Sequence, residues 1–184
     1  MKPIMPRERI AALKELLNGL EVEGAFVQCG VGNGVGAARI TEDFSGEVWL
    51  FDIYGEVPPI TEKDGPKAIW RYPLIVEQGV WQKNHVVENV QNAFLPRTPH
   101  IIKGWFKDTL AVTDTGPISF LSIDADWYES TRLALEVMVP RVIPEGIVVV
   151  DDYGHWDGCR KAVDEFLGDR KCTVLDWECV WWMQ

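Results

Sequence analysis

The fold is decided by two stretches, Ile118-Ser-Phe-Leu-Ser-Ile-Asp-Ala-Asp126 and Ile147-Val-Val-Val-Asp-Asp152, each an apolar run that ends in aspartates. Short apolar runs of this kind are typical of strands buried on both faces of a parallel sheet. The residues between them, from Trp127 to Val142, have helical character and predict a strand–helix–strand unit. The fold class is therefore α/β, and the aspartates lie at the carboxyl ends of neighbouring parallel strands, where open sheets bind ligands.

Four aspartates would meet at this edge, and their charges would repel one another unless a cation were present. Oxygen ligands without histidine or cysteine indicate a hard cation, most simply Mg²⁺. We expect Asp124, Asp151 and Asp152 to bind it and Asp126 to act as a general base. The alternative is that Asp126 and Asp152 only cap helices. His155, three residues further on, either acts on a substrate hydroxyl or forms a surface hydrogen bond. We expect His85 and His100 to be structural.

A second ligand-binding pattern lies near the N-terminus. The expected first strand, Ala25–Cys29, runs into Gly30-Val-Gly-Asn-Gly-Val-Gly36 and then into a helix. A strand, a glycine-rich turn and a helix bring backbone N–H groups close to a ligand, although a tight turn without a ligand is the alternative. Asp52, at the end of the next strand, is placed to accept hydrogen bonds from ribose hydroxyls. The spacing leaves NAD and S-adenosylmethionine open, because the glycines do not match the strict dinucleotide pattern.

The rest of the chain continues the alternation of helices and strands. We expect a helix from Pro6 to Gly19, a loop over the pocket mouth from Gly55 to Gly65, and a helix from about Gln82 to Leu95. The stretch from Trp70 onward has a mixed pattern that assigns no element before Gln82. Further predicted elements are strands at His100–Lys103, Cys172–Leu175 and Cys179–Trp182 and a helix at Gly158–Leu167, with the last two strands as an antiparallel hairpin.

The amino-acid composition limits the classes of protein to which the chain can belong. The chain has 184 residues, enough for one domain (1–184), and a net charge of -10, which disfavours nucleic acids and anionic membranes as partners. Its apolar stretches fall short of the roughly 18 residues that span a membrane. The N-terminus lacks the apolar core of a signal peptide, and four cysteines without metal-site spacing are expected to be reduced thiols. These features predict a cytoplasmic protein.

Several motifs in the order of the chain resemble the macrocin O-methyltransferase (TylF-type) family. They are Phe26-Val-Gln-Cys-Gly-Val31, Phe51-Asp52, Lys103-Gly-Trp-Phe-Lys-Asp-Thr-Leu110, Ile123-Asp-Ala-Asp-Trp-Tyr-Glu-Ser-Thr131, Asp151-Asp-Tyr-Gly154 and Gly158-Cys-Arg-Lys-Ala-Val-Asp-Glu-Phe166. The resemblance implies a Rossmann-like class I methyltransferase fold, with a mostly parallel sheet of about seven strands and a C-terminal antiparallel hairpin. It implies an enzyme that uses S-adenosylmethionine and Mg²⁺ to methylate a hydroxyl of a small molecule, such as a sugar or natural product.

The resemblance also assigns roles to residues. Asp124, Asp151 and Asp152 bind the metal and Asp126 is the candidate base, while Asp52 binds the ribose. Phe106, Lys107 and Asp108 border the adenine. The remaining implied cofactor residues surround the glycine turn and the metal: Gln28, Gly30, Val31, Gly32, Gly36 and Asp124.

Two departures from the family pattern modify this expectation. Gln28 stands where the family usually has Glu, so the charge that would face the cationic end of the cofactor is missing. The N-terminal helical segment, residues 1–22, is shorter than in typical members, which implies a more open acceptor site or a lid supplied by another subunit, possible in a homodimer. The alternative function is a non-catalytic S-adenosylmethionine-binding partner subunit. A nicotinamide dehydrogenase is a third hypothesis, disfavoured because the strict glycine fingerprint is absent.

Overall fold

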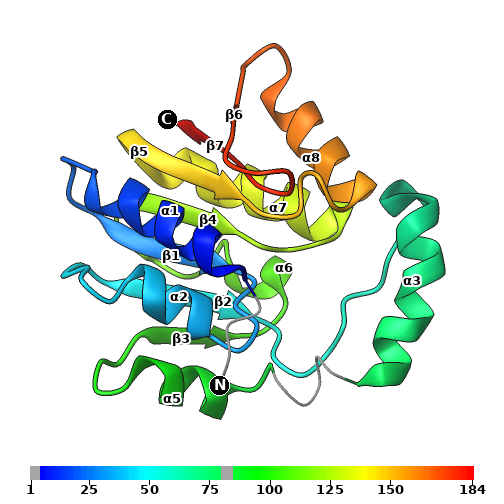
Figure 1. Cartoon of the computed structure of the whole chain (residues 1–184), viewed down its shortest axis with the longest axis horizontal. Coiled ribbons are helices and arrows are strands. Elements are labelled where there is room, and N and C mark those ends of the chain that lie inside the picture. Colours follow the sequence, from blue (N-terminus) through cyan, green and yellow to red (C-terminus); the bar gives the residue numbers. More distant parts are fainter. Residues whose placement is uncertain (1–4, 80–84) are drawn as a thin grey trace.

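The computed structural model, which describes residues 5–79 and 85–184, is built on one seven-stranded sheet (Figure 1). The strands follow the spatial order β3-β2-β1-β4-β5-β7-β6. The pairs among β1 to β5 are parallel, whereas β7 is antiparallel to both β5 and β6. The prediction of a mostly parallel sheet that ends in an antiparallel hairpin is confirmed. The strands are β1 (Ala25–Cys29), β2 (Val48–Asp52), β3 (His100–Lys103), β4 (Ile118–Ile123), β5 (Val142–Val150), β6 (Thr173–Val174) and β7 (Val180–Met183).

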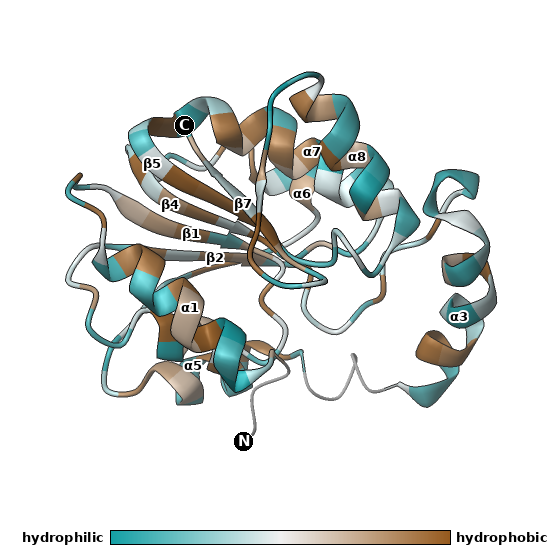
Figure 2. Ribbon diagram, turned by 45° about the horizontal axis from the view of Figure 1, so that its top comes forward, coloured by the Kyte–Doolittle hydropathy of each residue, from teal (hydrophilic) through white to brown (hydrophobic). Residues whose placement is uncertain are grey.

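Helices cover both faces of the sheet (Figures 1 and 2). On one face lie α1 (Arg7–Asn18), α2 (Val35–Ile40) and α5 (Val87–Phe94), and on the other lie α6 (Phe106–Thr109), α7 (Tyr128–Met138) and α8 (Asp157–Leu167). A separate cluster of buried apolar side chains fills each interface, and the hydrophobic residues gather in the central strands (Figure 2). Strands that are apolar on both faces are what this layered arrangement requires.

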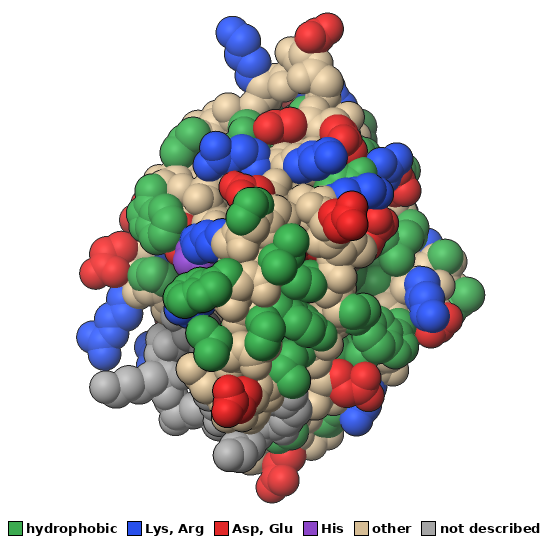
Figure 3. All heavy atoms as spheres, turned by 90° about the vertical axis from the view of Figure 1, so that its right-hand side faces the viewer, with side chains coloured by type: hydrophobic (Ala, Val, Ile, Leu, Met, Phe, Trp, Pro, Cys, Tyr) green, Lys and Arg blue, Asp and Glu red, His purple; other side chains and the backbone are tan. Residues whose placement is uncertain are grey.

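Two helices were not predicted from the sequence, the short α6 and the longer α3 (Gly65–Gln78). After a single 3-10 turn, η1 (Glu62–Asp64), the helix α3 stands away from the sheet (Figure 1). Ala68 is its buried residue, whereas Ile69, Trp70 and Leu74 are exposed, and apolar side chains gather on the face of the molecule that carries this helix (Figure 3). Because its apolar residues do not follow a single core-facing stripe, the helical period is weak in the sequence.

Several predicted boundaries are corrected by the structure. The helix expected from Trp127 to Val142 ends at Met138, and a 3-10 turn, η2 (Val139–Arg141), leads straight into β5, which starts five residues earlier than Ile147. Pro140 cannot continue a helical hydrogen-bond ladder, which explains the early end. Of the helix expected at 82–95, residues 82–84 lie outside the described part, and α5 covers Val87–Phe94. No helix among the described residues is long and apolar enough to cross a membrane.

The register of the parallel strands places the site. Cys29 lies beside Ile123, and Ile123 lies beside Val150, so β1, β4 and β5 end at the same level. The next residues stay in line, because Asp124 N–H donates to Cys29 O and Asp151 N–H donates to Ile123 O, both at 2.8 Å. The glycine turn and the aspartates therefore emerge at one edge of the sheet.

Candidate active site

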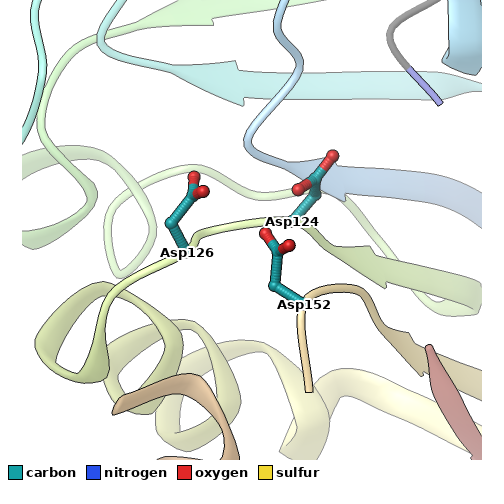
Figure 4. Close-up of side chains that lie close together, drawn as sticks. All are labelled: Asp124, Asp126 and Asp152. Carbon is teal, nitrogen blue, oxygen red and sulfur yellow. The ribbon is translucent and has the colours of Figure 1, made fainter. Parts of the chain in front are cut away.

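Three carboxylates form an acidic cluster at this edge: Asp124, Asp126 and Asp152. One carboxylate oxygen from each lies within 4.8 Å of the others, and the side chains project to the same side of the strand ends (Figure 4). Asp126 and Asp152 have left-handed backbones, with φ of 56° and 64°. Non-glycine residues hold this conformation at a cost, and such positions concentrate at functional sites. The loops after β4 and β5 are therefore shaped to bring these oxygens together.

The carboxylates of the acidic cluster ionise reluctantly. Burial, followed by the charges of Asp126 and Asp124, raises the pKa of Asp152 to about 11. Burial also raises the pKa of Asp126 to about 7, against the lowering effect of hydrogen bonds from Trp156 and Asp152, and raises that of Asp124 well above its usual value. A bound divalent cation would reverse this preference, because its charge favours ionised carboxylates. The donor set suits a hard cation such as Mg²⁺.

Asp151, a predicted metal ligand, lies next to the acidic cluster but has a different partner. Its Oδ1 atom accepts from Arg9 Nη1 at 2.5 Å, and Arg9 also binds Asp176 (2.7 Å) and Glu178 (2.6 Å). We call these three acidic residues with Arg9 the Arg9 group. The Arg9 side chain is only 4% exposed. Asp151 thus forms an ion pair with a side chain of the protein, whereas no ion pair in the described part of the chain includes a carboxylate of the acidic cluster.

The capping interpretation of the aspartates is wrong for the helix after β4. The backbone N–H of Tyr128, at the start of α7, donates to Asp64 Oδ1 at 2.6 Å, and no side-chain cap comes from Asp126. Asp126 instead accepts from Trp156 Nε1 at 3.1 Å. Trp156 precedes α8, which likewise has no side-chain cap from Asp152. Both aspartates are therefore free to serve the site.

The glycine turn packs directly against the acidic loop. Gly30 has φ of 86°, and a Cβ atom there would lie 1.8 Å from the backbone oxygen of Asp124, so only glycine is tolerated. Asp52 Oδ2 accepts from the backbone N–H groups of Val31 (2.7 Å) and Gly32 (3.2 Å). Gln28 Nε2 donates to Gly30 O at 2.8 Å, while its buried Oε1 has no hydrogen-bond partner among the described residues. The turn is thus shaped by the same residues that were predicted to bind a cofactor.

These features share a cavity of about 920 Å³. The predicted metal ligands and His155 line it, and so do the predicted cofactor residues with the exception of Asp108, which is exposed on α6. The cofactor residues that line it are Gln28, Gly30, Val31, Gly32, Gly36, Asp52, Phe106, Lys107 and Asp124. The loop predicted to lie over the pocket mouth also reaches it, through Glu56, Pro58, Pro59 and Thr61.

Several residues that line the cavity were not predicted from the sequence. Arg9 and Glu178 come from the two ends of the chain, and Arg71 and Ile75 come from the unpredicted helix α3. His85 was expected to be structural but lines the cavity, where burial lowers its pKa. The only available signal for Arg9 was a charged residue on the apolar face of an amphipathic helix, beside Ile10 and Leu13.

His155 is held from two sides. Its Nδ1 atom lies 2.9 Å from Glu178 Oε1, and its ring packs edge-on against Trp156 at 4.5 Å between centroids. By contrast, His100 stacks on Trp49 outside the cavity, as expected of a structural histidine.

Comparisons with known proteins agree with this geometry. The chain is 32% identical to 8-demethyl-8-(2,3-dimethoxy-alpha-L-rhamnosyl)-tetracenomycin-C 4'-O-methyltransferase of Streptomyces olivaceus, over 80% of this chain and 59% of that protein. It is 30% identical to demethyldecarbamoylnovobiocin O-methyltransferase of Streptomyces niveus, over 96% of this chain and 72% of that protein. The chain thus spans about three fifths of the length of the first of these relatives.

The fold has solved counterparts. The structure of the O-methyltransferase NovP superposes with a TM-score of 0.79 at 27% identity, covering 96% of this chain and 79% of NovP. The sequence model of the macrocin-O-methyltransferase (TylF) family matches residues 3–184. A match over nearly the whole chain, with the motifs gathered around one cavity, establishes the relationship: the chain belongs to the macrocin-O-methyltransferase (TylF) family.

Proposed function

We propose that the protein is an S-adenosylmethionine- and divalent-cation-dependent O-methyltransferase that acts on a hydroxyl of a small molecule. The observation that carries this proposal is the convergence of the glycine turn, Asp52 and the acidic cluster on one cavity of about 920 Å³. A cavity of this size can take a cofactor and part of an acceptor together. A methyl donor held beside an edge that can bind a cation and an acceptor hydroxyl would bring the two reactants together for transfer.

Features of the turn support the cofactor. The buried Oε1 atom of Gln28 is an acceptor in need of a donor, and the amino group of S-adenosylmethionine would provide one. Asp52 lies at the end of β2, where carboxylates accept from ribose hydroxyls, and Phe106 and Lys107 border the place proposed for the adenine. In this arrangement Gln28 binds the cofactor as a neutral hydrogen-bonding partner.

The cation has two proposed ligands that every assignment shares, Asp124 and Asp152. We retain Asp151 as the third ligand and Asp126 as the base, and the geometry supplies a rival in which Asp126 is the third ligand and Asp151 a partner of Arg9. The dissociation constant for Mn²⁺ distinguishes the two assignments. If Asp151 is the third ligand, Asp151→Asn weakens Mn²⁺ binding; if Asp126 is the third ligand, Asp126→Asn weakens it.

When bound, S-adenosylmethionine supplies an electrophilic methyl group, and a divalent cation lowers the pKa of a hydroxyl it coordinates. The chain's own contribution is to orient and to accept a proton. Asp126, fixed by Trp156 Nε1, faces the cavity and takes the proton of the acceptor hydroxyl. Its pKa of about 7 in the cation-free protein reflects burial, which also keeps bulk water from competing for that proton.

The proposed acceptor is a sugar hydroxyl of a natural product. The Streptomyces olivaceus relative is named for a rhamnosyl substrate, and the Streptomyces niveus relative for a novobiocin precursor. The cavity is also lined by Arg71 and Ile75 of α3 and by Leu133 and Glu136 of α7. A mixed polar and apolar surface of this kind suits a glycoside.

The test is methyl transfer from radiolabelled S-adenosylmethionine to L-rhamnosides, measured with added Mg²⁺ and with EDTA. Transfer should be lost in EDTA, and Asp124→Asn should lower it at least about 100-fold, since ligand loss exceeds the effect of losing an outer partner. Asp169→Asn, an exposed carboxylate outside the cavity, is the matched control and should keep the wild-type rate. Undiminished transfer in EDTA would remove the cation from the mechanism.

The non-catalytic partner subunit remains the second candidate, favoured by the neutral Gln28 in the cofactor region. It predicts S-adenosylmethionine binding by calorimetry with no transfer to any glycoside. Transfer by the isolated chain eliminates it.

We also propose a cytoplasmic location and a homodimer. The cysteines Cys29, Cys159, Cys172 and Cys179 are free thiols, as a reducing compartment would leave them.

The exposed apolar residues Ile69, Trp70 and Leu74 of α3 offer a surface for a second copy. Sedimentation of the wild type and of Trp70→Glu measures this association.

A further inference from the structure

Three segments far apart in the sequence meet beside the acidic cluster. Arg9 comes from α1, His155 from the loop after β5, and Glu178 from the turn between β6 and β7. All three side chains line the cavity. The sequence motifs singled out His155 but gave no partner for it, and neither Arg9 nor Glu178 has a place in the proposed methyl transfer.

Both oxygens of Glu178 are engaged. Its Oε2 atom accepts from Arg9 Nη2 at 2.6 Å, and its Oε1 atom lies 2.9 Å from Nδ1 of His155. The Glu178 side chain is 17% exposed and that of Arg9 4%. Because a guanidinium is a donor only, it favours the ionised, acceptor-only form of Glu178. Nδ1 of His155 must then carry a proton, which leaves Nε2 of the neutral ring as an acceptor.

The backbone fixes Glu178 at this distance. Gly154 N–H donates to Glu178 O at 3.1 Å, and a Cβ atom at Gly154 would lie 1.6 Å from the backbone oxygen of Trp177. Glycine at the end of the Asp151-Asp-Tyr-Gly154 motif therefore allows the C-terminal hairpin to approach the His155 loop. The loop is held in turn by the backbone N–H of His155, which donates to Asp152 O at 2.9 Å.

The ring of His155 has little freedom in this setting. It meets Trp156 edge-on at 4.5 Å and lies tilted against Trp177 at 5.8 Å between centroids. Lys67 Nζ donates to the backbone oxygen of His155 at 2.7 Å. Proteins orient a functional imidazole by such contacts: a carboxylate at Nδ1, aromatic rings that pack against the ring, and a backbone held by hydrogen bonds.

We propose that Glu178, itself fixed by Arg9, is a positioning residue that holds His155 in the Nδ1–H tautomer so that Nε2 accepts a hydrogen bond from the hydroxyl of the acceptor. This role rests on the proposed methyl transfer to a hydroxyl. It gives the N-terminal helix and the C-terminal hairpin a part in the site, since neither contributes a predicted ligand of the cofactor or the cation. Glu178 acts through His155 and is not itself a catalytic residue.

The first test needs no substrate. Ring ¹⁵N shifts from two-dimensional NMR report the tautomer of each histidine, and the chain has only three, His85, His100 and His155, so His155→Gln assigns the signal. Under conditions where the ring is neutral, wild-type His155 should be Nδ1–H, and Glu178→Ala should shift it toward Nε2–H. Glu178→Gln, which keeps the side-chain shape, serves if the alanine variant does not fold and should give a mixture. His100 contacts neither Glu178 nor His155, so its ring ¹⁵N shifts should be the same in every variant.

The second test uses the L-rhamnoside that the wild type methylates. Glu178→Ala and His155→Gln should each lower kcat/KM for this acceptor about 10- to 100-fold, the usual effect of losing an outer-sphere partner, and Glu178→Gln should lower it less. The dissociation constant for S-adenosylmethionine should stay the same, which a general loss of structure would not allow. Glu178→Ala and His155→Gln combined should cost no more than one of them, because both act through the same imidazole.

The outcomes are distinct. An Nε2–H wild-type ring, a tautomer that ignores Glu178, or an unchanged kcat/KM in Glu178→Ala would overturn the proposal. If the wild type shows the Nδ1–H tautomer and responds to Glu178 substitution but transfers no methyl group to any glycoside, the proposed function fails and the fixed orientation of His155 stands.

Discussion

Two groups of carboxylates lie side by side at the end of the sheet and differ in one respect, the presence of a cation. In the Arg9 group, Asp151, Asp176 and Glu178 surround a buried guanidinium. In the acidic cluster, Asp124, Asp126 and Asp152 lie close together, and none of them forms an ion pair with another described residue. Asp151 and Asp152, joined by one peptide bond, belong to different groups.

The pKa values reflect both burial and this difference in partners. Burial raises the pKa of Asp151 as well, although its ion pair with Arg9 acts in the opposite direction. Burial alone would raise the pKa of Asp176, but hydrogen bonds from Arg9 and from the backbone bring it below its usual value. Burial and the neighbouring carboxylates raise the pKa of Asp152 to about 11. Neighbouring aspartates at one strand end can therefore differ in what balances their charge: Arg9 for Asp151, and a proton or the proposed cation for Asp152.

Removing the internal cation should have the largest effect on the comparison. Arg9→Met leaves three carboxylates without their partner, and breaking a buried ion pair on one side costs about 3–5 kcal/mol of unfolding free energy. Urea denaturation followed by circular dichroism measures it. Arg132→Met is the matched control, since Arg132 pairs with Glu136 on the exposed surface and should change stability by less than about 1 kcal/mol. Equal losses in the two variants would contradict the special status of the Arg9 group.

Neutralising one carboxylate in each group should shift stability in opposite directions. In EDTA at neutral pH, Asp152 must take up a proton to be buried beside the other carboxylates, because its pKa is raised to about 11. Asp152→Asn removes that cost and should raise the unfolding free energy by about 1–3 kcal/mol, and asparagine tolerates the left-handed backbone there. Asp176→Asn removes a favourable charge that is partly exposed and should lower it by about 1 kcal/mol or less. The same denaturation experiment compares them, and shifts of the same sign would show that the two groups do not differ in charge balance.

The smallest expected effect is on the pH dependence of the cation-free protein. The pKa of Asp126 is about 7 in the folded state, above the value of about 4 in an unfolded chain, so the folded state holds more protons between these values. The contribution of Asp126 to the unfolding free energy is complete below about pH 4 and is lost as the pH rises through about 7. Over that range the unfolding free energy should fall by at most about 1.4 kcal/mol per pH unit. Thermal melts in EDTA from pH 5 to 8 should show a steeper decline for the wild type than for Asp126→Asn. Parallel curves would place the titration elsewhere.

Much of the architecture could be predicted from local patterns. The apolar runs before Asp124 and Asp151 specify parallel strands, and the glycine turn after Cys29 specifies a close approach that Gly30 then makes against Asp124. The helix α3 could not be predicted in this way, because its exposed Ile69 and Trp70 give no single apolar stripe. The place of His85 on the cavity could not be predicted either, because nothing in its neighbours along the chain indicates it.

The sequence by itself determined which side chains stand at the strand ends, because strand period and turn chemistry are local. It therefore predicted the edge where Asp124, Asp126, Asp151 and Asp152 emerge. Only the tertiary structure decided how these charges are shared, because Arg9 lies 142 residues from Asp151 and 169 from Glu178 along the chain. Coulomb interactions depend on distance in space, so the pairing of one aspartate and the repulsion among its neighbours exist only in the folded chain.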